Sequence, residues 1–442
     1  MVTLIPTAEP VVDQPTTAAP AGPVVRLWEV AVLLGYGILL GSGVAHHEPW
    51  SDEVQSWLLA RDASVVHLFA HQLRYEGSPG LWQLLLVPFA KAGLPVLTLN
   101  VVGAAVAFAG VAIVLFASPL PAPLRAALPF TYYFAFQYAV VARSYTLFVP
   151  LVLGVAACHR TRMERPLRYT VLLCLLSAVA VEAMVVAGVL FVLLLAETAR
   201  RSVDIPDLSA RIGGSLLLFF AVELFFVAVL WPTHDNKSPL ASALVLAPGA
   251  VWAGARSVLD VAYVGVPWLN YVILVFACIW LYTRRALLFF VLPTTAAVVF
   301  SAVKLHQLWF DGLLTMLLVA AVWVALDNEP RPVSWPAALR RWDDDTIAGA
   351  AVAGVIGVLA VVCVVQIGWT TRTYAWDAGH AYAPGPAAAQ WLRDHGLAGA
   401  PVATVGDYWA VDLEPYLPSG RFSNLGDEGA YFSWSRTEVP LP

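Results

Sequence analysis

A polar segment between two apolar stretches carries reactive side chains close to the start of the chain. Residues 46–53 read His-His-Glu-Pro-Trp-Ser-Asp-Glu and end in the acidic pair Asp52 and Glu53. A carboxylate here could act as a general base, or could hold a divalent cation such as Mg²⁺ or Mn²⁺ through oxygen ligands. The competing structural explanation is a helix start, with Ser51 as the N-cap and both acids stabilised by the helix dipole.

More ionisable residues follow before the next apolar stretch. Tyr75 and Glu76 precede Ser78 and Pro79, which are typical of a helix start with Ser as the cap and Pro in the first position. We expect Glu76 to face the same space as Asp52, and most of the histidines to be solvated. The other reactive residue types in this segment are His46, His47, Glu48, Arg61, Asp62, His67, His71 and Arg74.

The stretches on either side are apolar enough to lie in lipid. Of the 442 residues, 60% are hydrophobic and 12% are charged, whereas soluble domains carry about 25% charged residues. The four cysteines lie in apolar segments and show no metal-ligand spacing. The sequence predicts an all-α polytopic membrane protein with about 11–13 hydrophobic helices. The expected helices cover 26–45, 81–92, 95–117, 126–141, 144–158, 169–181, 183–197, 211–231, 261–282, 286–303, 312–326 and 346–368.

This pattern divides the chain into three regions. Residues 1–25 are rich in Pro, Ala, Thr and Val without a basic residue, which predicts a disordered tail and no cleavable signal peptide. Residues 26–368 form the expected transmembrane domain, in which 46–80 is the first outer loop. Residues 369–442 are polar enough for a small α/β tail with a short strand and a short helix that ends before Gly396.

Arginine clusters predict the orientation in the cell membrane. Basic residues are enriched in cytoplasmic connections of membrane proteins. Placing every such cluster in the cytoplasm makes the N-terminus cytoplasmic, puts the 46–80 loop and the C-terminal tail outside, and brings Glu182 near the outer face. Arg143 could lie on either side. The clustered connections are 160–168, 200–211, 284–285 and 331–341.

The segment 47–62, which reads HEPWSDEVQSWLLARD, resembles the first outer loop of bacterial GT-C membrane glycosyltransferases. These are relatives of the protein O-mannosyltransferases (glycosyltransferase family 39) and of the aminoarabinose transferase that modifies lipid A. In that family an acidic pair follows the first transmembrane helix, and a His-Pro-Pro-like turn enters the second. Here Ser78 stands in place of the expected His and Gly80 in place of the second Pro.

Two shorter motifs also match the family. Arg143 begins an Arg-Ser pair that resembles a break between paired helices, and Lys304 and His306 resemble a basic motif at the outer end of a late helix. The resemblance implies a GT-C-like bundle that moves a sugar from a polyprenyl-phosphate donor to a glycan, lipid or protein acceptor. Asp52 would take the acceptor proton during an inverting attack, and Glu53 would support it or bind the cation.

In such enzymes cations stabilise the charge that develops on the departing phosphate. Lys304 and His306 could instead be basic residues that reach the interface from a helix end. Glu182 is an ionisable residue inside the membrane and therefore a functional candidate, or it could pair with Arg143. The implied substrate-binding residues are Tyr75, Glu76, Arg143, Glu182, Lys304 and His306.

Two other functions stay open. A transporter or lipid flippase would place charges near mid-membrane, often with repeat symmetry, whereas this chain concentrates them in one loop and shows no repeat. A non-catalytic assembly subunit could have kept the fold and lost the chemistry. No Gly-rich phosphate loop follows a strand, so nothing indicates a nucleotide sugar, and the expected partners are the lipid-linked donor, the acceptor and the bilayer without nucleic acid.

Overall fold

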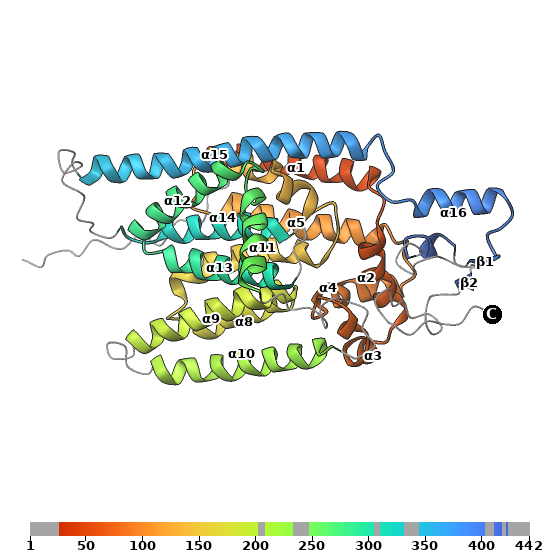
Figure 1. The fold of residues 1–442 in the computed structure, drawn as a ribbon, viewed down its shortest axis with the longest axis horizontal. Helices are drawn as coiled ribbons and strands as arrows, with labels where there is room; N and C mark the ends of the chain where they lie inside the picture. Colours follow the sequence, from red (N-terminus) through yellow and green to blue (C-terminus); the bar gives the residue numbers. More distant parts are fainter. Residues whose placement is uncertain are drawn as a thin grey trace, which may run out of the picture.

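The structure is a computed structural model that describes residues 26–201, 208–232, 247–304, 310–330, 344–402, 411–417 and 421–422, and these are almost entirely helical (Figure 1). Within them, six helices are long and apolar enough to cross a membrane. The prediction of a helical membrane protein is therefore confirmed. The six helices are α1 (Leu27–His46), α5 (Thr98–Ala117), α9 (Val181–Arg201), α10 (Leu208–Leu230), α13 (Leu287–Lys304) and α15 (Asp344–Asp377).

Shorter apolar helices fill the space between the long ones. The centre of the bundle is α14 (Asp311–Asp327), whose residues are buried from Asp311 to Ala325, as expected for a helix that is apolar all round. Figure 1 shows the helices running roughly side by side, with α15 and α1 along one edge and α10 along the other. The other short helices are α4 (Leu81–Lys91), α7 (Phe148–Cys158), α8 (Pro166–Ser177) and α12 (Pro267–Thr283).

The prediction of one continuous helix over 126–141 is wrong. The chain there forms α6 (Ala122–Ala127), a 3₁₀ turn and a π-helical turn at Tyr133–Gln137, and then runs without regular structure to Arg143. Pro129 lacks the N–H that a continuing helix needs, and the carbonyl of Phe136 instead accepts bonds from three following amides. A second helix, α11 (Pro248–Val261), lies in a segment where a loop was expected.

The expected helical first loop is confirmed, but the cap residues predicted for its helices, Ser51 and Ser78, are wrong. Helix α2 (Ser51–Asp62) has Trp50 at the N-cap, so Ser51 is the first helical residue. Helix α4 begins after Gly80, not at Pro79. Gly80 has φ +105°, a conformation that proline cannot adopt. This explains why glycine, and not a second proline, suits this turn. The loop continues through α3 (Val65–Ala70) and the short 3₁₀ helix η1 (Gln72–Tyr75).

Beyond α15 the tail forms α16 (Gly385–Asp394) and a parallel pair of two-residue strands, β1 (Pro401–Val402) and β2 (Arg421–Phe422). Figure 1 places α16 and both strands past the end of α15, on the side where α2 and α3 lie. Val411, fully buried, packs in one apolar cluster with residues of α2 and α4. The tail is therefore attached to the first loop. The predicted disorder of residues 1–25 lies outside the described residues.

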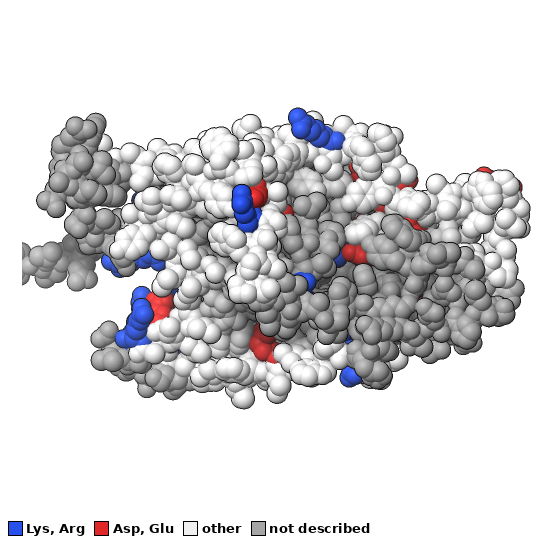
Figure 2. Space-filling model, viewed as in Figure 1, with Lys and Arg blue, Asp and Glu red and all other residues white. Residues whose placement is uncertain are grey.

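The arginine-rich connections lie at the opposite end of the bundle. A single cavity is lined by residues from 159–164, from the end of α9 and from the turn at 285–289, so the clusters in these three connections share one end, as predicted. The fourth cluster, beginning at Arg331, is outside the described residues. In Figure 2 blue and red atoms adjoin at the lower left of the molecule, and other charged residues are scattered singly or in pairs over the rest of this face.

Candidate functional site

The side of Arg143 was open from the sequence, and the structure places it beside Asp52. Arg143 Nη2 lies 2.8 Å from Asp52 Oδ2, and the two side chains are only 19% and 17% exposed. Asp52 comes from the first turn of α2, and Arg143 ends the irregular segment that follows the π-helical turn. The guanidinium also lies over the rings of Trp50 and Tyr145, 5.5 Å and 5.7 Å from their centroids, in a cation–π arrangement.

Glu76 belongs to the same polar cluster. Gln55, one turn along α2 from Asp52, donates a hydrogen bond from Nε2 to Glu76 Oε1. Burial raises the pKa of Glu76 to about 7, and the negative charge of Asp52 adds to this shift, whereas Gln55 and Arg143 oppose it. A carboxyl group with a pKa near the working pH can exchange a proton readily.

Glu182 and Lys304 extend the cluster toward the interior. Tyr145 donates a hydrogen bond from its hydroxyl to Glu182 Oε2 at 3.1 Å, and Glu182 is 7% exposed. The charges of Lys304 and Arg143 both act on Glu182. The start of α9 is tied to the first loop because Val181 N–H donates to the carbonyl of Gly77 at 3.1 Å. Glu182 therefore lies at the same end of the bundle as Asp52, as expected.

Glu53 points away from this cluster, although it follows Asp52 directly. It is fully buried, and each of its oxygens accepts two hydrogen bonds. Oε1 accepts from Asn100 Nδ2 at 2.9 Å and from the Ala142 N–H at 2.7 Å. Oε2 accepts from His47 Nε2 at 3.0 Å and from the Trp50 N–H at 3.2 Å. We therefore assign Glu53 a positioning role, because it fixes the backbone next to Arg143 and leaves little room for a cation.

Helix α5 holds the other side of this arrangement. Asn100 donates to Glu53 and also to the carbonyl of Val140, at 2.9 Å. A Cβ on Gly103 would lie 2.9 Å from the Cβ of Ala142, closer than real Cβ contacts come, so only glycine allows this approach. The close approach brings the Ala142 amide, and with it Arg143, to the start of α2.

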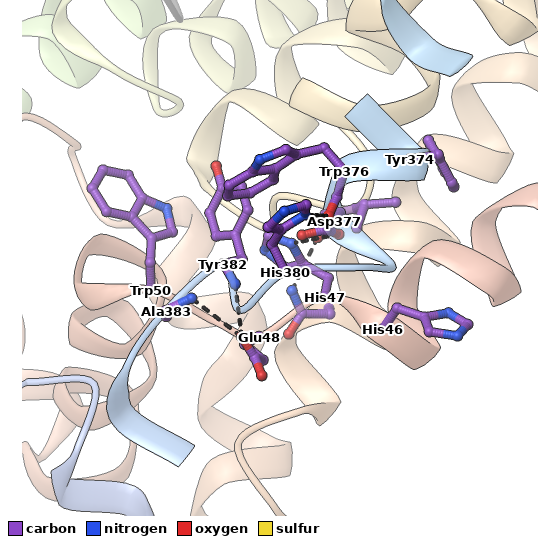
Figure 3. Close-up of polar contacts among 12 residues, drawn as sticks. His46, His47, Glu48, Trp50, Tyr374, Trp376, Asp377, His380, Tyr382 and Ala383 are labelled. Atoms are coloured by element: carbon purple, nitrogen blue, oxygen red, sulfur yellow. Dashed lines mark hydrogen bonds and ion pairs between the residues drawn. The ribbon is translucent and has the colours of Figure 1, made fainter. Parts of the chain in front are cut away.

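Figure 3 shows a junction between the first loop and the tail, around His47 and Glu48. His47 lies between two carboxylates, with Nε2 3.0 Å from Glu53 and Nδ1 3.3 Å from Asp377. Burial alone would lower the pKa of His47, but the two carboxylates outweigh it and raise that pKa to about 9. Glu48 Oε2 accepts bonds from the backbone N–H groups of Tyr382 at 2.7 Å and Ala383 at 3.3 Å.

The remaining sequence candidates differ in their surroundings. His46 is exposed and bonds to the carbonyl of Ser42, while the rings of His67 and His71 contact each other near the surface. Tyr75 is half-buried at the end of η1. His306 is outside the described residues. The sequence did not single out Gln55, Tyr145 or Asp377, because each has a common residue type and gains its place only through the fold.

The donor chemistry does not fit a divalent cation. Among the described residues, no group of three or more His, Cys, Asp or Glu side chains is arranged to hold a metal ion. Both oxygens of Glu53 are engaged by hydrogen-bond donors, and Asp52 is paired with Arg143.

Comparisons of the chain with family models, with curated proteins and with solved structures found no match. The class that the fold defines is a helical membrane protein with a partly buried ionic cluster at one end. The resemblance to GT-C glycosyltransferases rests on the three motifs of the sequence and stays a prediction.

Proposed function

We propose that the protein is a GT-C-like membrane glycosyltransferase that moves a sugar from a polyprenyl-phosphate donor to an acceptor outside the cell membrane. One observation carries this proposal: five ionisable side chains, two from the first loop and one each from three segments far from it in the sequence, come together in one partly buried cluster. Intramembrane charges are costly and usually mark a functional site. The five are Asp52, Glu76, Arg143, Glu182 and Lys304.

Each group has a role in the proposed reaction. The acceptor hydroxyl attacks the anomeric carbon in line, a new carbon–oxygen bond forms, and its proton passes to the carboxylate of Asp52. The bond between that carbon and the phosphate oxygen breaks, and the phosphate leaves with the electron pair. Arg143 and Lys304 stabilise the charge on the departing lipid phosphate. In-line displacement inverts the anomeric carbon.

The lipid nature of the donor suits this position. A polyprenyl chain would stay in the bilayer while its phosphate reaches the polar end of the bundle. The orientation predicted from the arginine clusters puts this end outside. The rings of Trp50, Tyr138 and Tyr145 line the space around Arg143 with aromatic surface, since Tyr138 and Tyr145 stack at 5.9 Å.

The test compares two Asp→Asn substitutions in the same helix. Asp52→Asn should lower sugar transfer from labelled polyprenyl-phosphate sugars in proteoliposomes by about 10²–10⁴-fold, the usual contribution of a general base. Asp62→Asn is the matched control, because Asp62 pairs with Arg61 outside the cluster. Equal transfer by Asp52→Asn and the parent protein would remove Asp52 as the base. Lipid flux across the liposome without transfer would instead favour a flippase.

A further inference from the structure

A cavity of about 760 Å³ opens at the end of the bundle opposite the ionic cluster. Its walls come from four places in the chain: the connection at 159–164, the end of α9, the turn and first residues of α13 at 285–289, and residues 327–329 at the end of α14. The residues that act in the proposed sugar transfer lie at the other end of the bundle, so the cavity must have a different function.

Some arginines that line the cavity are paired with acidic side chains and others are not. Glu197 accepts from Arg162 at 2.5 Å and Arg201 at 2.8 Å, and Asp327 faces the charge of Arg160. Two exposed acids, Glu164 and Glu329, complete the negative groups. Within the described part of the chain, the guanidinium groups of Arg200 and Arg285 have no ion pair, and both are exposed at the cavity. Two such groups, one from α9 and one from the turn before α13, suit the binding of a phosphate.

The remaining wall is apolar. Leu193, Leu288 and Phe289 line the cavity from α9 and α13, and Leu288 is 53% exposed. Both helices are among those apolar enough to cross a membrane. A ligand here would therefore meet guanidinium groups at one end and lipid-facing side chains at the other. This combination fits an amphipathic anion better than a free phosphate ion.

Arg285 stands in a backbone conformation that rarely accepts a side chain. Its φ is +56°, and it follows the end of α12. Ala286 N–H donates to the carbonyl of Leu281 at 2.9 Å and Arg285 N–H to that of Tyr282 at 3.3 Å. This is the Schellman helix end, in which the left-handed residue is usually glycine. This conformation disfavours an arginine relative to glycine, so the turn itself gives no reason for this residue type.

We propose that this cavity binds the headgroup of an anionic glycerophospholipid. Arg200 and Arg285 hold the phosphodiester oxygens, and the glycerol and the first acyl carbons lie against Leu193 and Leu288. Basic pockets between transmembrane helices on the cytoplasmic side are suited to such headgroups, and the arginine clusters predict that this end is cytoplasmic. This binding is independent of the transferase proposal.

The test measures lipid retention by native mass spectrometry. The full chain, purified in detergent and stripped of lipid, is exposed to mixed micelles with equal amounts of phosphatidylglycerol and phosphatidylcholine. We expect a retained phosphatidylglycerol molecule in the parent protein. The double variant R200Q/R285G should bind it about 30-fold more weakly, which corresponds to about 1 kcal/mol for each arginine near the surface.

Two controls separate a built site from general surface charge. R165Q/R211Q removes the same charge from exposed arginines that do not line the cavity, and it should keep the lipid. R285G alone should weaken lipid retention without lowering the thermal midpoint of the lipid-free protein, because glycine suits the turn. Equal lipid loss in both double variants, or no preference for phosphatidylglycerol, overturns the proposal. Inorganic phosphate that stabilises the protein while no lipid is retained overturns the lipid assignment.

Discussion

Asp52 and Glu53 are neighbours at the start of α2, yet they belong to two charge networks of different physical character. Glu53 is fully buried, and four donors use both of its oxygens. Asp52 is partly exposed and faces Arg143 in a cluster that also holds Glu76. One network closes the junction between the first loop and the tail, and the other surrounds the candidate reaction space.

The difference between the two networks indicates which charges are structural. In the junction, every carboxylate oxygen of Glu53 has geometric partners, so its removal leaves buried donors unsatisfied. In the cluster, Glu76 is destabilised as an anion by burial and by Asp52. A group with a strongly perturbed proton affinity is a candidate for chemistry. Substitutions should therefore reduce stability in the first network and activity in the second.

The largest effect is expected for Glu53→Gln. The amide NH₂ would face donors from Asn100, Ala142 or His47, and His47 would keep only one carboxylate. Breaking a buried ion pair from one side typically costs about 3–5 kcal/mol, measured as unfolding of the purified protein in detergent. Glu48→Gln is the control at the same junction, because Glu48 accepts only two backbone bonds and should cost less. If Glu53→Gln left the stability unchanged but abolished sugar transfer, Glu53 would have a catalytic role and not a positioning one.

Arg143→Met should act mainly on activity. Removing one preorganised donor to a developing oxyanion costs about 10²–10³-fold in turnover, and Arg143→Lys should recover part of this because it keeps the charge but loses the planar fork. Arg61→Met is the matched control, since Arg61 forms ion pairs with Asp62 and Glu414 in the same loop. If both methionine variants reduced transfer equally, Arg143 would be a general loop anchor and not a phosphate partner.

The residues of the cluster were easier to predict from the sequence than the helices and turns that bring them together. Apolar runs and the acidic pair led to Asp52, Glu76 and Glu182, because charges in apolar surroundings are conspicuous. The side of Arg143 could not be predicted, since the interrupted helix at 126–141 looks continuous in hydropathy. The periodicity of apolar residues cannot show which backbone N–H group will donate to Glu53.

The tail junction could not be predicted at all. His47 and Asp377 are 330 positions apart, and neither belongs to a motif with a fixed partner. The turn at Gly80 was misplaced for a related reason. Ser78 and Pro79 satisfy the local signals of a helix start, but Gly80 takes a left-handed conformation against Leu73 and Phe69, and the helix begins at Leu81. Both outcomes depend on contacts that the local sequence signals do not contain.

The junction should also respond to alkaline pH through His47. Its pKa is about 9 in the folded protein against about 6.5 in an unfolded chain. The protonated form thus stabilises the fold fully below about pH 6.5, and this contribution is lost as the pH rises through about 9. The loss is on the order of 3 kcal/mol. Unfolding of the parent protein at pH 6 and pH 10 should differ by more than that of His47→Gln. Parallel pH curves for the two proteins would show that His47 is neutral in the fold.

The smallest effect is expected from the titration of Glu76 in the cluster around Asp52. Glu76, with a pKa of about 7, is mostly neutral at pH 6 and mostly charged at pH 8. Its charge would lie near Asp52 and repel an incoming phosphate. The Kd for a polyprenyl-phosphate sugar, whose phosphodiester does not titrate in this range, should therefore rise by about tenfold between these pH values, the effect of about 1.4 kcal/mol of repulsion. Glu76→Gln removes the titration and should bind equally at both, while Glu48→Gln keeps the parent's pH dependence. A polyprenyl-phosphate sugar that binds more tightly at pH 8 in the parent protein would mean that the anion of Glu76 is not near the phosphate. The cluster would then have lost the feature that separates it from the junction, namely a carboxyl group that is free to change its charge as substrate arrives.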